Sequence, residues 1–123
     1  MSVNKFQFIG NLTRDTDVRY TGNDRTIGIF DLAVPDEWRD SKGEKQEKTN
    51  FFRIKTWDKT AENAGKYLGK GSQVYVEGRI ENTQFEKNGV TVYGMDFIAE
   101  QVQYLRTKPP GSRQSDQPPG EDE

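Results

Sequence analysis

Apolar and polar residues alternate along most of this chain, and a period of two is typical of β-strands that bury one face. The alternating runs are separated by turn-forming residues and lie at residues 3–12, 26–34, 51–57, 72–85 and 90–105. Residues 14–20 continue the first run in extended form, as far as a turn at residues 21–24. The pattern therefore predicts five strand regions.

One segment has the helical period instead. Ala61, Ala64 and Leu68 fall on one face of a helix over about residues 59–68. Asp58 is placed to cap the start of this helix, and Gly69 is placed to end it. We therefore predict one short helix between the third and fourth strands.

Five strands with one helix in this position predict an all-β protein that closes into a small barrel. The OB-fold, a five-stranded Greek-key barrel, has this composition of elements and binds oligonucleotides on one face. Several glycines inside the strand patterns would allow the strong bending that closure requires, namely Gly10, Gly28, Gly78 and Gly94. A β-sandwich of similar size remains the alternative from the pattern alone.

The connection between the second and third strands is long and polar. Pro35 is expected to end the second strand, and residues 36–48 are expected to form a loop or an exposed hairpin around Lys42-Gly43. Trp38 stands next to Arg39 among the polar residues of this connection. Because that is an unusual place for a core tryptophan, we expect its ring to face solvent or a ligand.

Residues 51–57 combine rings and cations in one strand. Side chains alternate across a strand, so Phe52, Ile54 and Thr56 share the face that we expect to be buried. The opposite face carries a ring, two cations and a second ring, in the order Phe51, Arg53, Lys55 and Trp57. This outer row predicts an extended binding surface.

The next strand divides in the same way. Val74, Val76, Gly78 and Ile80 form an apolar row, whereas the other row is mixed and includes Tyr75, Glu77, Arg79, Glu81, Thr83 and Phe85. The two glutamates in the mixed row indicate that the surface is not uniformly basic.

A protein surface that binds single-stranded nucleic acid combines aromatic rings with cations. Its bases stack on aromatic side chains, at about 1–3 kcal/mol for each base, and its phosphates attract cations. Two alternatives stay open for these residues: the rings pack under loops or at a subunit interface, and individual cations are solvated charges without a ligand.

Composition excludes several other functions. The chain contains no Cys and no His, which removes disulfides, thiolate and Ser–His catalysis, and zinc sites of the Cys/His type. The sequence around Lys70 resembles a phosphate-binding loop, but its glycine spacing does not fit the motif. We therefore expect no enzyme activity, no cofactor and no metal. The first ten residues contain no apolar stretch long enough for a signal peptide or a membrane span. We expect a cytoplasmic, nucleoid-associated protein.

Charge and composition divide the chain into two parts. Residues 1–108 hold 17 Lys and Arg with 16 Asp and Glu, whereas the remaining fifteen residues hold one Arg and four acids. The end of the chain is rich in Pro and lacks aliphatic and aromatic residues. We predict a folded domain over residues 1–106 and a disordered acidic tail over residues 107–123.

Several motifs, taken in order, resemble the bacterial single-stranded DNA-binding protein family. They are "IGNLTRD", "EWRD", "EKTNFFRIKTWDK", "GKGSQVYVEGR" and "MDFIAEQVQYL", within residues 1–106. The resemblance implies an OB-fold, binding of single-stranded DNA without sequence specificity in replication, recombination and repair, and assembly, usually into a homotetramer, with a homodimer as the alternative.

The resemblance also implies roles for individual residues. The expected stacking rings are Trp38, Phe51, Trp57 and Phe85, and the expected phosphate ligands are Arg39, Arg53, Lys55, Lys59, Lys70 and Arg79. Phe52 replaces a histidine that is common in the family near subunit contacts, so the assembly is expected to differ in detail.

The end of the chain departs from the family pattern. Its last residues, "QPPGEDE", are acidic but lack the hydrophobic hook through which family members recruit replication and repair proteins. Recruitment by that route is therefore in doubt. A rival interpretation is an OB-fold module that binds RNA, or that binds only proteins as a primosome accessory subunit.

Overall fold

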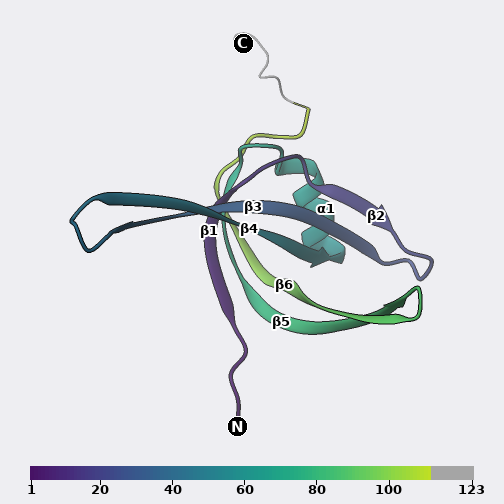
Figure 1. The fold of residues 1–123 in the computed structure, drawn as a ribbon. Coiled ribbons are helices and arrows are strands. Elements are labelled where there is room, and N and C mark those ends of the chain that lie inside the picture. Colours follow the sequence, from purple (N-terminus) through teal and green to yellow (C-terminus); the bar gives the residue numbers. More distant parts are fainter. Residues whose placement is uncertain (112–123) are drawn as a thin grey trace.

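The computed structural model describes residues 1–111 as six strands and one helix (Figure 1). The elements are β1 (Phe6–Leu12), β2 (Asp17–Tyr20), β3 (Thr26–Arg39), β4 (Lys45–Trp57), α1 (Asp58–Tyr67), β5 (Gln73–Lys87) and β6 (Val90–Arg106). The five predicted strand regions and the helix are all present, but β3 runs five residues beyond the predicted end at residue 34, and β4 begins six residues before the predicted start at residue 51.

Five of the strands close into a barrel. The hydrogen-bonded order is β1-β5-β6-β4-β3, and β3 returns to pair with β1, so the sheet has no open end. The one parallel contact is between β4 and β6, where Ile54 lies opposite Phe97 and Lys55 lies opposite Ile98. Closure confirms the predicted five-stranded OB-type barrel and excludes the sandwich.

The first barrel strand is broken in the middle. β1 pairs with β3 at Leu12 and Leu32, and β2 resumes the pairing along the same edge of β3 from Asp17 to Tyr20. Between them the backbone leaves the ladder, and Thr16 donates through its N–H and its hydroxyl to the carbonyl of Leu68, at 3.2 and 2.9 Å. The extended segment predicted at residues 14–20 is therefore the second half of a bent strand.

The barrel interior is filled by the apolar rows of its strands. Its fully buried side chains include Phe30, Leu32, Ile54, Leu68, Val74 and Val76. Four phenylalanines add a cluster of rings, in which Phe8 stacks on Phe52 with centroids 4.1 Å apart, while Phe6 and Phe97 pack against them. The ring of Phe52 therefore packs against other rings of the same chain.

Two of the predicted bending glycines have a clear steric reason. A Cβ at Gly78 would collide with the backbone carbonyl of Ile98, where the β5–β6 ladder shifts its register. A Cβ at Gly28 would collide with the Thr56 hydroxyl and with Ala61 of α1. These glycines let neighbouring strands and the helix approach closely.

Two expectations about element ends were wrong. Pro35 does not end the second strand: β3 runs on to Arg39, because beyond the barrel it pairs only with β4 and the missing N–H of proline lies on a strand edge. Asp58 does not cap α1, since no side chain makes a cap hydrogen bond there. Instead its carboxylate accepts two hydrogen bonds from Arg25, at 2.9 and 3.0 Å.

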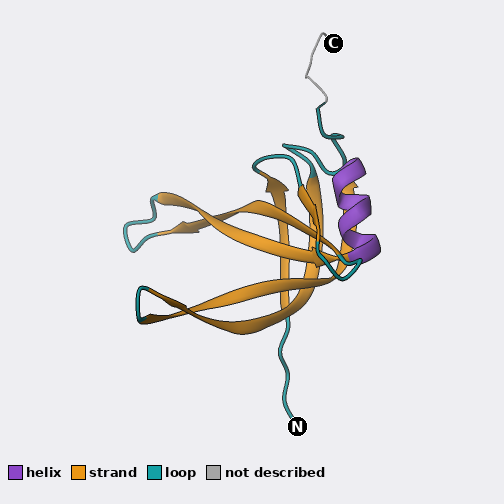
Figure 2. Cartoon of the chain, turned by 90° about the vertical axis from the view of Figure 1, so that its right-hand side faces the viewer, coloured by secondary structure: helices purple, strands orange, loops and turns teal. Residues whose placement is uncertain are grey.

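Two long hairpins extend from the barrel on the side away from α1 (Figure 2). One is the β3–β4 hairpin, which is the predicted exposed hairpin, and the other is the β5–β6 hairpin. The N-terminal residues and the end of β6 leave the barrel at opposite ends (Figure 1).

The chain is still attached to the barrel just after β6. Gly69 donates to the carbonyl of Lys108 at 2.7 Å, and the Ser72 hydroxyl accepts from the Lys108 N–H at 2.9 Å. These contacts lie two residues beyond the domain end that was predicted at residue 106. Residues 112–123 of the predicted tail lie outside the described residues.

Candidate nucleic-acid interface

The outer row of β4 has the alternation that the sequence predicts. Ile54 and Thr56 are fully buried, so Phe51, Arg53, Lys55 and Trp57 must face outward. Phe51 is 66% exposed, although it lies in the middle of a paired strand. A large ring held open on a rigid barrel wall is available for stacking.

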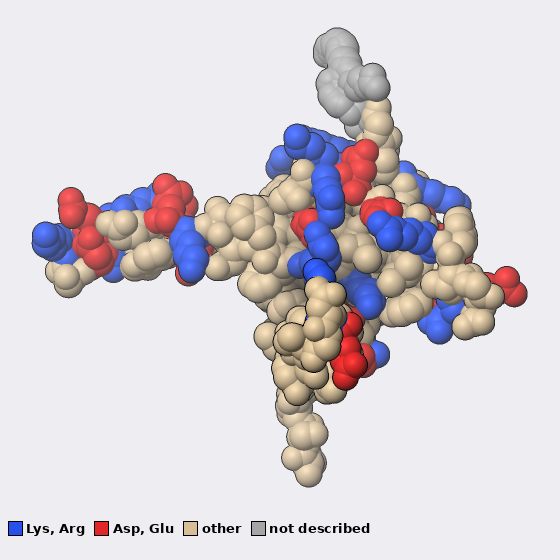
Figure 3. Space-filling view, turned by 45° about the vertical axis from the view of Figure 1, so that its right-hand side comes forward, with Lys and Arg blue, Asp and Glu red and all other residues tan. Residues whose placement is uncertain are grey.

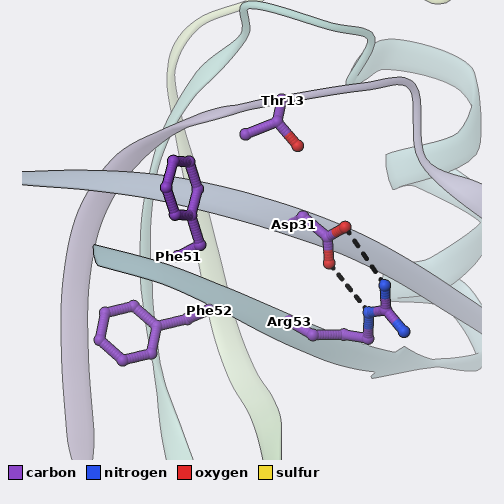
Figure 4. Close-up of a pocket in the computed structure, with 5 residues that line it drawn as sticks. All are labelled: Thr13, Asp31, Phe51, Phe52 and Arg53. Carbon is purple, nitrogen blue, oxygen red and sulfur yellow. Dashed lines mark hydrogen bonds and ion pairs between the residues drawn. The ribbon is translucent and has the colours of Figure 1, made fainter. Parts of the chain in front are cut away.

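Phe51 stands beside an open pocket of about 490 Å³ (Figure 4). Asp31 and Arg53 line the same pocket, and their side chains form hydrogen bonds of 3.0 and 3.4 Å. The hydrogen bond to Asp31, followed by its charge, raises the pKa of the Arg53 guanidinium above its ordinary value. Arg14 also reaches Asp31, at 3.2 Å, so a single carboxylate serves two arginines.

The other predicted cations of the barrel wall also have carboxylate partners. Lys55 contacts Asp96 of β6 at 2.8 Å. Arg79 contacts Glu81 at 2.8 Å and Glu100 at 3.3 Å, and the hydrogen bond from Arg79 to Glu81 is the main reason that the pKa of Arg79 is raised. A phosphate that approaches this wall must therefore compete with a carboxylate for each cation.

Trp57 is the last residue of the outer row, and its ring lies beneath a cation that was not predicted from the sequence. The Arg25 guanidinium lies 4.6 Å from the centroid of the Trp57 ring, in a cation–π contact. Asp58 holds Arg25 in this position, and their hydrogen bond, the largest contribution, lowers the pKa of Asp58. Arg25 lies 33 residues from Asp58, so no local pattern reveals it.

Two of the predicted rings lie outside this row, and Trp38 is the one on the β3–β4 hairpin. The β3–β4 register is continuous, with Ala33 opposite Phe51 and Trp38 opposite Gln46, which assigns Trp38 and Phe51 to opposite faces of the hairpin. Trp38 is 45% exposed, as expected from its polar surroundings. Its neighbour Arg39 faces the other way and donates to the carbonyl of Gly43 at 2.9 Å.

Phe85 lies in the outer row of β5, on the same face as Arg79, and it is 54% exposed. The opposite face of the β5–β6 hairpin carries two more exposed apolar side chains, Tyr93 and Met95. The sequence analysis did not single out Tyr93 and Met95. The alternation of residues 92–97 could have indicated them, because they share a row with Phe97, which packs against the core.

The last two predicted phosphate ligands differ from those on the wall. Lys59 lies in the first turn of α1 and Lys70 follows the helix, and both are exposed. Within residues 1–111 neither ammonium group makes an ion pair, and only the backbone N–H of Lys70 is engaged, by Asp15 at 2.8 Å.

Charges of both signs alternate over the visible surface and along the β3–β4 hairpin (Figure 3). The wall therefore has rings in an electrically mixed surface, as the glutamates of the mixed row indicated. No helix among the described residues has the length and hydrophobicity to span a bilayer, and no metal-ligand cluster occurs in this part of the chain.

A closed five-stranded barrel with exposed rings on its outer face defines the class of small OB-fold binding domains. The model of the Single-strand binding protein family matches residues 3–105, and the chain therefore belongs to that family. This confirms the resemblance inferred from the motifs.

Curated relatives agree with this assignment. The chain is 39% identical over 106 residues to a single-stranded DNA-binding protein of Neisseria meningitidis, which covers 85% of this chain and 61% of the relative. It is 38% identical over 107 residues to a single-stranded DNA-binding protein of Oceanobacillus iheyensis, with 86% and 65% covered. The chain thus spans roughly three fifths of the length of these relatives.

Solved structures share the fold. The single-stranded DNA-binding protein of Thermus aquaticus, in a deletion mutant, superposes with a TM-score of 0.77 at 33% identity, covering 86% of this chain and 54% of that one. A Plasmodium falciparum SSB, solved as a complex with ssDNA, also gives 0.77 at 26% identity, covering 85% and 96%.

Proposed function

We propose that this protein binds single-stranded DNA without sequence specificity, as a binding protein rather than an enzyme. Bases stack on Phe51, Trp57, Phe85 and Trp38, and phosphates contact the cations beside them. The observation that carries the proposal is the outer row of β4, where two rings flank two cations on a rigid barrel wall. Stacking tolerates every base, because each base has a flat π-face.

Family membership and the complex of the Plasmodium relative with ssDNA support this proposal. The expected setting is DNA exposed during replication, recombination and repair, in the cytoplasm at the nucleoid.

We also propose that the protein assembles as a homotetramer, with a homodimer as the alternative. Ile9 supports assembly, since this apolar side chain is exposed on the outward face of β1 within the barrel wall. Size-exclusion chromatography with light scattering, with and without oligo-dT, measures the mass directly. A monomer under both conditions would reject the assembly while leaving DNA binding untouched.

Titration of the intrinsic tryptophan fluorescence tests the function. Oligo-dT should quench the emission strongly, because Trp38 and Trp57 are the only tryptophans and both are proposed to stack on bases. Duplex DNA should have little effect, since its bases are already stacked. Stronger quenching by oligo-rU than by oligo-dT would favour an RNA-binding module, and no response to either would favour a protein-interaction module.

A further inference from the structure

A second aromatic site lies between α1 and β6, away from the hairpins. Its lining residues form what we name the tyrosine cleft: Thr60, Asn63, Tyr67, Val102, Gln103 and Tyr104. The cleft has a volume of about 580 Å³, within the range of about 300–1,000 Å³ that is usual for small-molecule sites. None of the four predicted stacking rings lines it.

The chain connects this cleft to the end of β4, where the outer row ends at Trp57. β6 runs parallel to β4 and pairs with it only at Phe97 and Ile98. α1 follows β4 without a connecting loop, so the next part of β6 runs beside the helix. The helix therefore leads the chain directly from Trp57, the last residue of β4, to the lining of the tyrosine cleft.

The helix presents polar and aromatic side chains to the tyrosine cleft at regular spacing. Thr60, Asn63 and Tyr67 lie three and four residues apart, which places them on one face of α1. That face begins immediately after Trp57, the last ring of the outer row. Tyr67 is the next aromatic residue after Trp57 along the chain.

Two tyrosine rings offer flat surface inside the cleft. Their centroids are 6.3 Å apart with the planes at 54°, and Tyr67 is 49% and Tyr104 37% exposed. Tyr104 lies opposite the fully buried Val74, so it extends a core row beyond the end of the barrel. Burial is the main reason that the pKa of Tyr104 is raised.

The charges around the cleft suit a polyanion. Among residues 1–111, the side chains that line the cleft include hydroxyl and amide groups but no carboxylate. Lys59 and Lys70 stand at the two ends of α1, and within residues 1–111 neither is neutralised by an ion pair. The barrel wall is different, since Arg53, Lys55 and Arg79 all contact carboxylates there.

We propose that the tyrosine cleft is a further base-stacking subsite, which extends the single-stranded DNA track past Trp57 and along α1. Lys59 and Lys70 bind phosphates of the strand near the two ends of α1. This inference rests on the proposed function and adds a site to it.

The test compares the double variant Tyr67→Ala with Tyr104→Ala against Tyr20→Ala. Tyr20 is a matched control because it is an exposed tyrosine of β2 and lies beside the opposite face of α1, with Gly65 and Lys66. Affinity is measured with labelled oligo-dT of about 16 nucleotides, the upper end of OB-fold site sizes. The number of nucleotides occluded per protomer is measured on poly-dT.

The cleft variant should bind the oligonucleotide about 5- to 150-fold more weakly, which corresponds to the loss of one base stack. It should also occlude fewer nucleotides per protomer, while Tyr20→Ala matches the wild type in both measurements. The corresponding Tyr→Phe double variant should keep the wild-type affinity, because stacking needs the ring and not the hydroxyl.

The outcomes separate the two proposals. If the wild type binds oligo-dT and Phe51→Ala weakens binding, but the cleft variant keeps full affinity and occluded length, only the subsite is rejected. If the wild type does not bind oligo-dT, the proposed function itself fails. Thermal unfolding is followed in parallel, and a cleft variant that melts earlier but occludes the same length would assign the tyrosines to stability and reject the subsite.

Discussion

The barrel wall and the α1–β6 edge carry similar residue types but differ in their electrostatics. On the wall, Arg53 and Lys55 lie between two rings, and each contacts an aspartate at about 3 Å. At the α1–β6 edge, Lys59 and Lys70 stand at the two ends of the helix that carries Tyr67, and within residues 1–111 their ammonium groups form no ion pair. On the proposed function, we expect the rings to supply most of the DNA affinity on the wall and charge to contribute more at the edge.

Removal of a wall ring should have the largest effect. Phe51→Ala and Trp57→Ala should each weaken binding of oligo-dT by about 1–3 kcal/mol, the value of one stacked base, whereas Trp57→Phe should cost much less. Fluorescence anisotropy with labelled oligo-dT measures the change. If Trp57→Ala binds normally but unfolds more easily, its ring belongs to the core and not to the DNA surface.

Charge removal at the edge should have the next largest effect, which is seen in the salt dependence. If about four phosphates are neutralised, log K against log salt should slope near −3, because each phosphate contributes about −0.7 for single strands. Lys59→Gln combined with Lys70→Gln should flatten the slope by about 1.4.

The matched control removes a whole ion pair from the wall. Lys55→Gln combined with Asp96→Asn leaves the net charge unchanged and should alter the slope little, because Lys55 is already neutralised by Asp96. If the Lys55–Asp96 double variant changed the salt slope more than the Lys59–Lys70 double variant, the wall and not the edge would supply most of the charge contribution.

Release of the wall arginines should have a smaller and opposite effect. Asp31→Asn frees Arg53 and Arg14 for phosphates, so oligo-dT should bind about two- to five-fold more tightly, as expected for an exposed ion pair. Asp36→Asn removes the same charge from β3, but no arginine contacts Asp36 in the described residues. Equal tightening in both variants would indicate a general charge effect.

The smallest expected effect concerns the cation over Trp57. Arg25 lowers the pKa of Asp58, so the contact is complete above the ordinary aspartate range and is lost as the pH falls through the lowered value. Protonation of Asp58 should release Arg25 and change the emission of Trp57 at acid pH. In a Trp38→Phe background, Trp57 is the only tryptophan, and Asp58→Asn should abolish the acid transition. A transition that survives Asp58→Asn would assign it to another carboxylate.

Much of the fold followed from the sequence because the decisive patterns are local. The alternation over residues 51–57 determined which side chains of β4 are buried, and the structure agrees for Ile54, Thr56 and Phe51. The predicted end of β3 was wrong because a proline interrupts a strand only where a neighbouring strand would accept a hydrogen bond from its N–H, and Pro35 has no such neighbour in the described residues. That condition depends on strand order, which a local pattern does not contain.

The electrostatics of the site could not be predicted for the same reason. The partners of Arg53, Lys55 and Arg25 lie 22, 41 and 33 residues away and come together only through strand pairing. The tyrosine cleft likewise joins α1 to the end of β6. Individual rings and cations were recognisable, but their neutralising partners were not.

The closure of the barrel has a consequence for folding kinetics. The β3–β4 and β5–β6 hairpins each join strands that are neighbours in sequence, whereas closure brings β1 to β5, as in the contact between Lys5 and Glu77, which are 72 residues apart. Because loop-closure entropy opposes distant pairing, we expect the hairpins to form early and β1 to join last. The hairpins that carry Trp38, Phe51 and Phe85 would then exist before the barrel closes. Partly folded chains would expose these rings and associate through them, so the refolding yield should fall as the protein concentration rises.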